Sequence, residues 1–280
     1  MTNLLKFASI TKKITLALLG LFLMIFLLMH LGINLCMLRD DGGAWFSAAA
    51  HFMGTNYIVK IIEVILFAVI LLHILLGVFI QIQNWTARPI GYKVPSRSKT
   101  STGSKFMIYT GCLILAFLAL HFVNFYFVKL GVVEGQYMVK MEDLQHADQA
   151  VLQQNQEALV ALFQNTDKAT AQAQPFKEVA SGLTKEQIHT VLGANFTEYE
   201  PDFYTMSRKL FQQPIYYIIY LVLFVFLAFH LFHAFTSAFQ TLGLRNPKYT
   251  PAIQVIAGVY TIVVFVGFSI IPLWFLFFYN

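Results

Sequence analysis

Hydrophobic residues gather into five long runs, and most polar residues lie in the segments between them. Each run has about 20 residues or more, which is the length an α-helix needs to cross the hydrocarbon core of a bilayer. Because lipid offers no partner for unpaired backbone groups, these runs are expected to be helices. The predicted spans are approximately 14–38, 57–83, 106–129, 214–242 and 253–279. The pattern predicts an all-α integral membrane protein, with one bundle of five transmembrane helices over residues 1–280.

The charges of the polar segments predict how the chain is oriented. Three segments contain basic residues and no acidic ones: the N-terminal segment with Lys6, Lys12 and Lys13, the segment 84–105, and the connection that contains Arg245 and Lys248. Lysine and arginine accumulate on the cytoplasmic side of membrane proteins. We therefore expect the N-terminus in the cytoplasm. The C-terminus and the acidic segment 130–213 are then expected on the extracytoplasmic side.

Segment 130–213 is long enough to form a small unit, and we expect a helical insertion there. Residues 141–164 carry apolar side chains at the spacing of an amphipathic helix. Further along, Thr184 and Gln187 have the spacing of a capping box, and Gly193 is placed to end the helix that they begin. We find no catalytic arrangement of residues in this segment.

Composition supports a membrane protein and argues against one alternative. Hydrophobic residues make up 58% of the chain and charged residues only 12%, which is outside the usual range of soluble proteins. A net charge of +5 could indicate nucleic-acid binding. The basic residues, however, occupy short segments next to the spans, as membrane orientation requires. The lipid bilayer, and no nucleic acid, is therefore the expected partner.

Four of the five runs contain histidine, which needs a polar partner inside a membrane. At 1.5 Å per residue, His30 and His121 lie about 25 Å and about 24 Å from the basic segments beside their runs. His73 and His230 lie about 16 Å and about 20 Å from the polar ends of theirs. The depths define an outer pair, His30 with His121, and an inner pair, His73 with His230. Paired imidazoles at two depths suit two b-type haems, so we predict these four residues as haem-iron ligands.

Alternatives remain for these histidines and for the residues around them. His233 lies one turn beyond His230 on nearly the same face and could replace it. A membrane histidine can also simply hydrogen-bond a backbone carbonyl. Several residues near the inner pair are candidates for contact with haem or its propionates, although the ordinary role of an interface residue is the favoured alternative for each. They are Gly77, Gln81, Arg88, Ser237 and Thr241.

Short motifs accompany the histidines in a fixed order. Gly20 precedes His30 by ten residues, and Gly111 precedes His121 by ten. The remaining motifs are HFMGTN at 51–56, NWTARPIGY at 84–92 and SAFQTLG at 237–243. Together they resemble the dihaem cytochrome b membrane-anchor subunit of succinate:quinone oxidoreductases, in its single-chain, five-helix form, and look closest to the Bacteroidetes-type version. The resemblance covers nearly the whole chain outside 130–213.

The resemblance implies a role in a bacterial respiratory complex, succinate dehydrogenase or fumarate reductase, in the inner membrane. A flavoprotein subunit with covalent FAD would interconvert succinate and fumarate. An iron–sulfur subunit would exchange electrons with this chain, which would connect it through two haem b groups to a quinone, often menaquinone. The C-terminus and the insertion would be periplasmic, and a dimer of the heterotrimer is compatible with the family. In the family, the fourth-span ligand lies thirteen residues before a glycine such as Gly243, which selects His230 over His233.

One family feature is missing from the sequence. Some dihaem fumarate reductases carry a glutamate two residues before the fourth-span ligand, and this glutamate is linked to proton transfer across the membrane. The corresponding residue here is Ala228. We therefore do not expect that proton pathway in this chain.

Two ionisable residues near the outer pair are candidates for quinone chemistry. His51 lies just before the second span, and Glu63 lies within it. A carboxylate inside a membrane is a functional candidate, and either residue could accept a proton released by quinol oxidation. In the plainer alternative, Glu63 pairs with Lys60 and His51 caps a loop.

Two other functions are compatible with the same pattern. The chain could be the dihaem cytochrome b anchor of a hydrogenase or a formate dehydrogenase, which would copurify with nickel or molybdopterin subunits. It could also be a proton-coupled transporter that uses its intramembrane histidines and binds no haem. The sequence has no inverted repeat or pair of broken helices, which disfavours the transporter.

Overall fold

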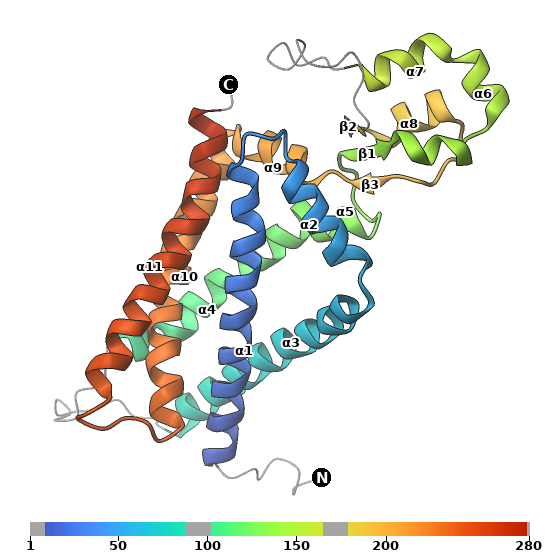
Figure 1. Cartoon of the computed structure of the whole chain (residues 1–280). Helices are drawn as coiled ribbons and strands as arrows, with labels where there is room; N and C mark the ends of the chain where they lie inside the picture. The colour runs from blue at the N-terminus through green and yellow to red at the C-terminus, as the bar shows by residue number, and fades with distance from the viewer. Residues whose placement is uncertain (1–8, 88–101, 165–178, 279–280) are drawn as a thin grey trace, which may run out of the picture. The chain divides into compact units, whose positions relative to one another are not determined.

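The computed structural model describes residues 9–87, 102–164 and 179–278 (Figure 1). The chain divides into two compact units. The first, the membrane unit, comprises Met1–Phe117 and Pro214–Asn280, and the second is Leu118–Gln213.

Five helices in the described part of the chain are long and apolar enough to cross a membrane, which confirms the predicted all-α membrane fold. Four of the spans correspond to α1 (Ser9–Leu35), α3 (Tyr57–Thr86), α10 (Pro214–Thr241) and α11 (Thr250–Phe277). The other span consists of α4 (Thr102–His121), the π-helix η2 (Phe122–Tyr126) and α5 (Phe127–Lys129). The predicted boundaries agree to within a few residues, because the length of an apolar run sets the length of a membrane helix.

Helix α1 packs against α3, α10 and α11 in the membrane unit. It runs parallel to α11. Tyr260 Oη of α11 donates a hydrogen bond to the Met24 carbonyl of α1 at 3.0 Å, and Gly267 lies against Leu31 further along. Both pairs are separated by the same 236 residues, so the two helices keep one register over this length.

Helices α1 and α3 run in opposite directions. Near the start of α1, Lys12 Nζ donates a hydrogen bond to Gln83 Oε1 of α3 at 3.1 Å. Further along α1, Gly20 faces His73. The two contacts place the start of α1 beside the end of α3, and Gly20 beside His73.

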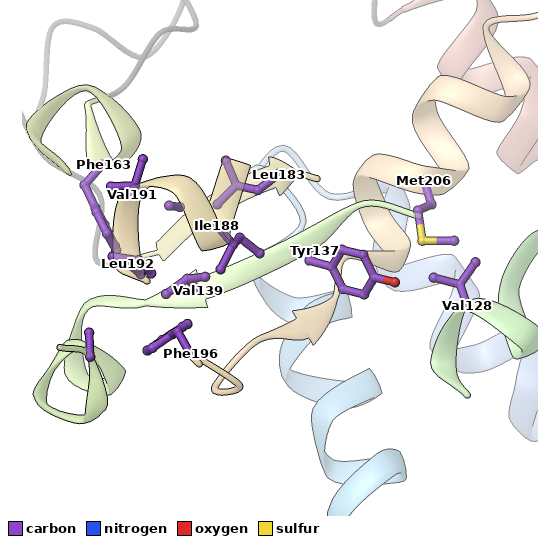
Figure 2. Close-up of a cluster of buried hydrophobic side chains, with 12 residues drawn as sticks. Val128, Tyr137, Val139, Phe163, Leu183, Ile188, Val191, Leu192, Phe196 and Met206 are labelled. Carbon is purple, nitrogen blue, oxygen red and sulfur yellow. The ribbon is translucent and has the colours of Figure 1, made fainter. Parts of the chain in front are cut away.

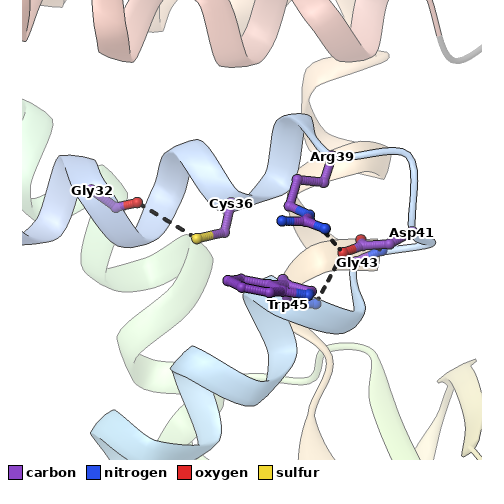
Figure 3. Close-up of polar contacts among 6 residues, drawn as sticks. All are labelled: Gly32, Cys36, Arg39, Asp41, Gly43 and Trp45. Atoms are coloured by element: carbon purple, nitrogen blue, oxygen red, sulfur yellow. Dashed lines mark hydrogen bonds and ion pairs between the residues drawn. The ribbon is translucent and has the colours of Figure 1, made fainter.

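A tight turn connects the 3₁₀ helix η1 (Cys36–Leu38) to α2 (Ala44–Thr55), and Asp41 organises it (Figure 3). Its Oδ1 accepts from the Gly43 amide at 3.0 Å, and its Oδ2 accepts from the Trp45 amide at 3.3 Å. Oδ2 also pairs with Arg39 Nε at 3.4 Å, while the Arg39 guanidinium lies 4.1 Å from the Trp45 ring centroid. These contacts define the start of α2, the helix that carries His51.

The second unit contains a three-stranded antiparallel sheet in the order β2-β1-β3. The strands are β1 (Tyr137–Lys140), β2 (Val179–Leu183) and β3 (Glu200–Pro201). Besides η2 and α5, the unit contains the helices η3 (Met141–His146), α6 (Gln149–Gln154), α7 (Gln156–Phe163), α8 (Lys185–Leu192) and α9 (Phe203–Phe211). Val139, Ile188 and Leu192 are fully buried in its core, which has its own set of apolar side chains (Figure 2).

The prediction of a helical insertion is correct only in part, because the sheet was not predicted. Strands β1 and β3 have four and two residues, too few for an alternating pattern to be visible in the sequence. The predicted helix at 141–164 is divided into three pieces. Asp148 caps a new helix by accepting from the Ala150 amide at 2.9 Å, and Asn155 separates α6 from α7.

The local signals at α8 are confirmed. Thr184 and Gln187 form both hydrogen bonds of the capping box, which satisfy backbone groups at the start of the helix. The helix ends at Gly193, whose φ of 100° lies in the region that favours glycine.

The Asp202 side chain connects β2 to the start of α9 in the second unit, and we expect its removal to destabilise that unit. Its side chain is in a residue only 2% exposed, and it accepts from the Gly182 amide and the Thr205 amide, both at 3.0 Å. Asp202→Ala leaves two amides without their acceptor, which should cost about 3 kcal/mol. Asp202→Asn keeps one acceptor oxygen and should cost less.

Hydrogen exchange at the amides of Gly182 and Thr205 in the full-length chain measures this effect. Exchange should accelerate strongly in Asp202→Ala and less in Asp202→Asn. Equal protection in all three proteins would contradict this role for Asp202.

Candidate functional site

His73 of α3 and His230 of α10 each face a glycine on a neighbouring helix. A Cβ atom added to Gly20 of α1 would lie 3.5 Å from His73 Cε1. One added to Gly111 of α4 would lie 3.8 Å from His230 Cε1. Each imidazole thus lies beside a glycine of a neighbouring helix, and we call these two imidazole–glycine pairs together the inner site.

The hydrogen bonding of the two inner-site imidazoles differs. His73 Nδ1 is buried and has no hydrogen-bond partner among the residues that the structure describes. A buried polar atom without a partner costs about 1–3 kcal/mol. His230 Nδ1, in contrast, lies 3.2 Å from Thr110 Oγ1 of α4. The inner site thus offers one imidazole with an unused buried nitrogen and one that is oriented by a hydroxyl group.

His233 lies three residues beyond His230 on α10. A Cβ atom added at Gly20 or Gly111 would not come within 4 Å of the His233 side chain. The arrangement of glycines therefore favours His230 over His233 as the inner-site imidazole of α10.

The predicted outer pair is distributed over the two units. His30 of α1 belongs to the membrane unit, where its ring lies beside Phe26 and Phe268, with centroid distances of 5.5 Å and 5.8 Å. His121 is the last residue of α4 and belongs to the second unit, with its ring 5.1 Å from that of Phe125. The π-helix η2 begins directly after it, and such helices are frequent at functional sites. The pairing of His30 with His121 stays a prediction.

Close packing of α1 on α11 beside His30 leads to a testable expectation. A Cβ atom on Gly267 would lie 2.8 Å and 2.9 Å from the two terminal methyl groups of Leu31, which is only 3% exposed. Gly267→Ala should therefore lower stability by about 1–3 kcal/mol through overpacking. Gly258 of the same helix is a matched control, since nothing lies within 4 Å of an added Cβ there. Thermal unfolding in detergent should show a lower midpoint for Gly267→Ala only; equal midpoints would contradict the close contact.

The residues predicted near haem or its propionates are placed as follows. An added Cβ at Gly77 would meet nothing within 4 Å, so its backbone is accessible, and Gln81 is half-buried one turn further along α3. Ser237 of α10 is exposed. Thr241 lines a recess of about 400 Å³ together with Ile10, Lys13 and Gln240. Arg88 lies outside the described residues.

The quinone candidates occupy successive helices. His51 is half-buried on α2, where Thr55 Oγ1 donates to its backbone carbonyl at 2.8 Å. Glu63 is half-buried on α3. Lys60, the partner considered for Glu63, has its ammonium group 5.8 Å from the Tyr57 ring centroid. Their role in quinone chemistry stays a prediction.

The spans differ in how much of their surface the chain itself covers. In the most apolar window of Thr250–Phe277, 33% of residues are buried, compared with 6% for Tyr57–Thr86 and 0% for Phe106–Lys129. Two of the four inner-site helices, α3 and α4, therefore have few or no residues in these windows that the chain itself buries fully. Among the described residues, no three histidine, cysteine, aspartate or glutamate side chains are grouped as a metal site. An iron held between two imidazoles needs only two protein ligands.

Comparison with known proteins identifies no relative: no family profile, no curated protein and no solved structure matches the chain. The fold therefore defines the class of the protein, which is an integral membrane protein with five helical spans.

Proposed function

We propose that this chain is the membrane anchor and electron-transfer subunit of a succinate dehydrogenase or quinol:fumarate reductase complex. In this role it connects an iron–sulfur subunit to menaquinone or another quinone through two haem b groups. The observation that carries the proposal is the inner site, where His73 lies beside Gly20 and His230 lies beside Gly111.

The inner-site residues fit a haem. The buried Nδ1 of His73 lacks a partner among the described residues, and an iron ligand role for the imidazole would explain why this side chain lies in an apolar span. The two glycines leave backbone without side chains next to the imidazoles, where a flat ring system needs room. When bound, haem b supplies reversible one-electron chemistry at its iron.

The chain itself would perform four tasks in this function. His73 and His230 would hold one iron, and His30 and His121 the other. The apolar spans around them would keep water away from the bound groups. The basic residues Lys12, Lys13, Arg245 and Lys248 would form the cytoplasmic surface that receives the iron–sulfur subunit. At the opposite end, His51 or Glu63 would accept a proton from quinol.

Purification of the intact complex from its native membrane tests this function. We expect a flavoprotein with covalent FAD and an iron–sulfur subunit to copurify with the chain, together with bound quinone. Nickel or molybdopterin subunits in their place would assign the chain to a hydrogenase or a formate dehydrogenase. A chain that purifies without haem and without redox partners would contradict the proposal, and proton-coupled transport would then be the function to test.

A further inference from the structure

Thr110 makes three contacts through one hydroxyl group. Its Oγ1 lies 3.0 Å from the Met107 carbonyl oxygen and 3.3 Å from the Phe106 carbonyl oxygen, both in the preceding turn of α4. The third contact reaches across to α10, where His230 Nδ1 is 3.2 Å away. The next residue, Gly111, lies beside Cε1 of the same imidazole. The side of the His230 ring that carries Nδ1 and Cε1 thus faces Thr110 and Gly111 of α4.

The number of protons in this group of contacts determines the direction of the hydrogen bond. A hydroxyl has a single proton to donate and two lone pairs to accept with. Threonine in a helix commonly donates to a carbonyl of the preceding turn, and the Met107 carbonyl is the nearest acceptor. Oγ1 can then interact favourably with His230 only by accepting, which requires a proton on His230 Nδ1. In the neutral ring, Nε2 is left with its lone pair.

We propose that Thr110 is a positioning residue, which accepts a hydrogen bond from His230 Nδ1–H and so presents Nε2 of His230 as the iron ligand of the inner site. This inference rests on the proposed haem site for the ligand role, while the tautomer of His230 can be tested without haem. The hydrogen bond also raises the basicity of the imidazole, as the outer partners of metal-bound histidines do. A more basic ligand favours the oxidised iron and lowers its reduction potential.

The tautomer is tested first, on the full-length chain produced in cells that cannot make haem and labelled with ¹⁵N-histidine. NMR shifts distinguish a protonated from an unprotonated Nδ1. We expect His230 Nδ1 to be protonated in the wild type and in Thr110→Ser, which keeps the hydroxyl. Thr110→Val keeps the shape and removes the hydroxyl, so the two tautomers should become mixed. An Nδ1 without a proton in the wild type would overturn the inference.

The second measurement is a redox titration of the haem-loaded protein. At a fixed solution potential, Thr110→Val should increase the ratio of reduced to oxidised iron severalfold at one haem only, and Thr110→Ser should restore the wild-type ratio. Thr236→Val is the matched control, because Thr236 Oγ1 donates to the Phe232 and His233 carbonyls, both at 3.1 Å, in the same kind of helical contact. The control should leave both haems unchanged.

The outcomes separate this inference from the proposed function. Two haems with unchanged titration in Thr110→Val would overturn the role of Thr110 and leave the proposed function intact. A chain that binds no haem would contradict the proposed function and the ligand role, whereas the NMR result would still decide the hydrogen bond.

Discussion

Replacement of either inner-site histidine with alanine should remove one haem and leave the other, so haem content should fall by about half. If both imidazoles hold the same iron, as proposed, His73→Ala and His230→Ala would each remove one of its two protein nitrogens, and the loss of one is expected to release the haem. The two variants should lose the same haem, recognised by its redox titration. Haem per chain is measured by pyridine haemochrome absorbance on the purified protein.

His233→Ala is the control for this experiment, because His233 is the adjacent histidine on α10 and has no atom within 4 Å of a Cβ added at Gly20 or Gly111. It should keep both haems. Full haem content in His230→Ala, combined with loss in His233→Ala, would transfer the ligand role to His233. His30→Ala and His121→Ala should remove the other haem, which tests the outer pair separately.

Leucine at either inner-site glycine should also abolish the inner haem while every histidine remains. Gly20 and Gly111 each face an imidazole, with added Cβ atoms at 3.5 Å and 3.8 Å from Cε1, so a larger side chain would occupy the space beside the ring. Gly20→Leu and Gly111→Leu are therefore expected to bind about one haem per chain. The optical spectrum and the redox titration should show that the remaining haem is unaffected.

Gly258→Leu provides the comparison for the glycine variants. It makes the same substitution in a membrane helix at a position where nothing lies within 4 Å of an added Cβ. Both haems should remain, and the protein should unfold at the same temperature as the wild type. Two haems in Gly20→Leu and Gly111→Leu would show that the space beside the imidazoles is not used by haem.

The sequence predicted the membrane fold well because a span is specified locally. Twenty consecutive apolar residues define a membrane helix whatever surrounds it. The capping box at Thr184 and the stop at Gly193 were predicted for the same reason, since each depends on residues a few positions apart. The sheet of the second unit was missed because it pairs Tyr137 with Leu183, 46 residues away, through strands too short to show a pattern.

The candidate site was predicted only in outline. Depth along each run separated His73 and His230 from His30 and His121, but the level of Gly20 relative to His73 depends on how α1 and α3 pack. Gly20 and Gly111 were noticed for their distance from His30 and His121 on the same helix, whereas their side-by-side partners are His73 and His230. The contact of Thr110 with His230 could not be predicted, because nothing in the sequence places the two residues opposite each other.

Haem stoichiometry of the wild-type chain is the most direct test of the central idea, that imidazoles from separate membrane helices hold iron in the interior of the bundle. The account predicts two haem b per chain, both low-spin with two nitrogen axial ligands in electron paramagnetic resonance. A folded, monodisperse protein from haem-replete cells that contains no haem would contradict it.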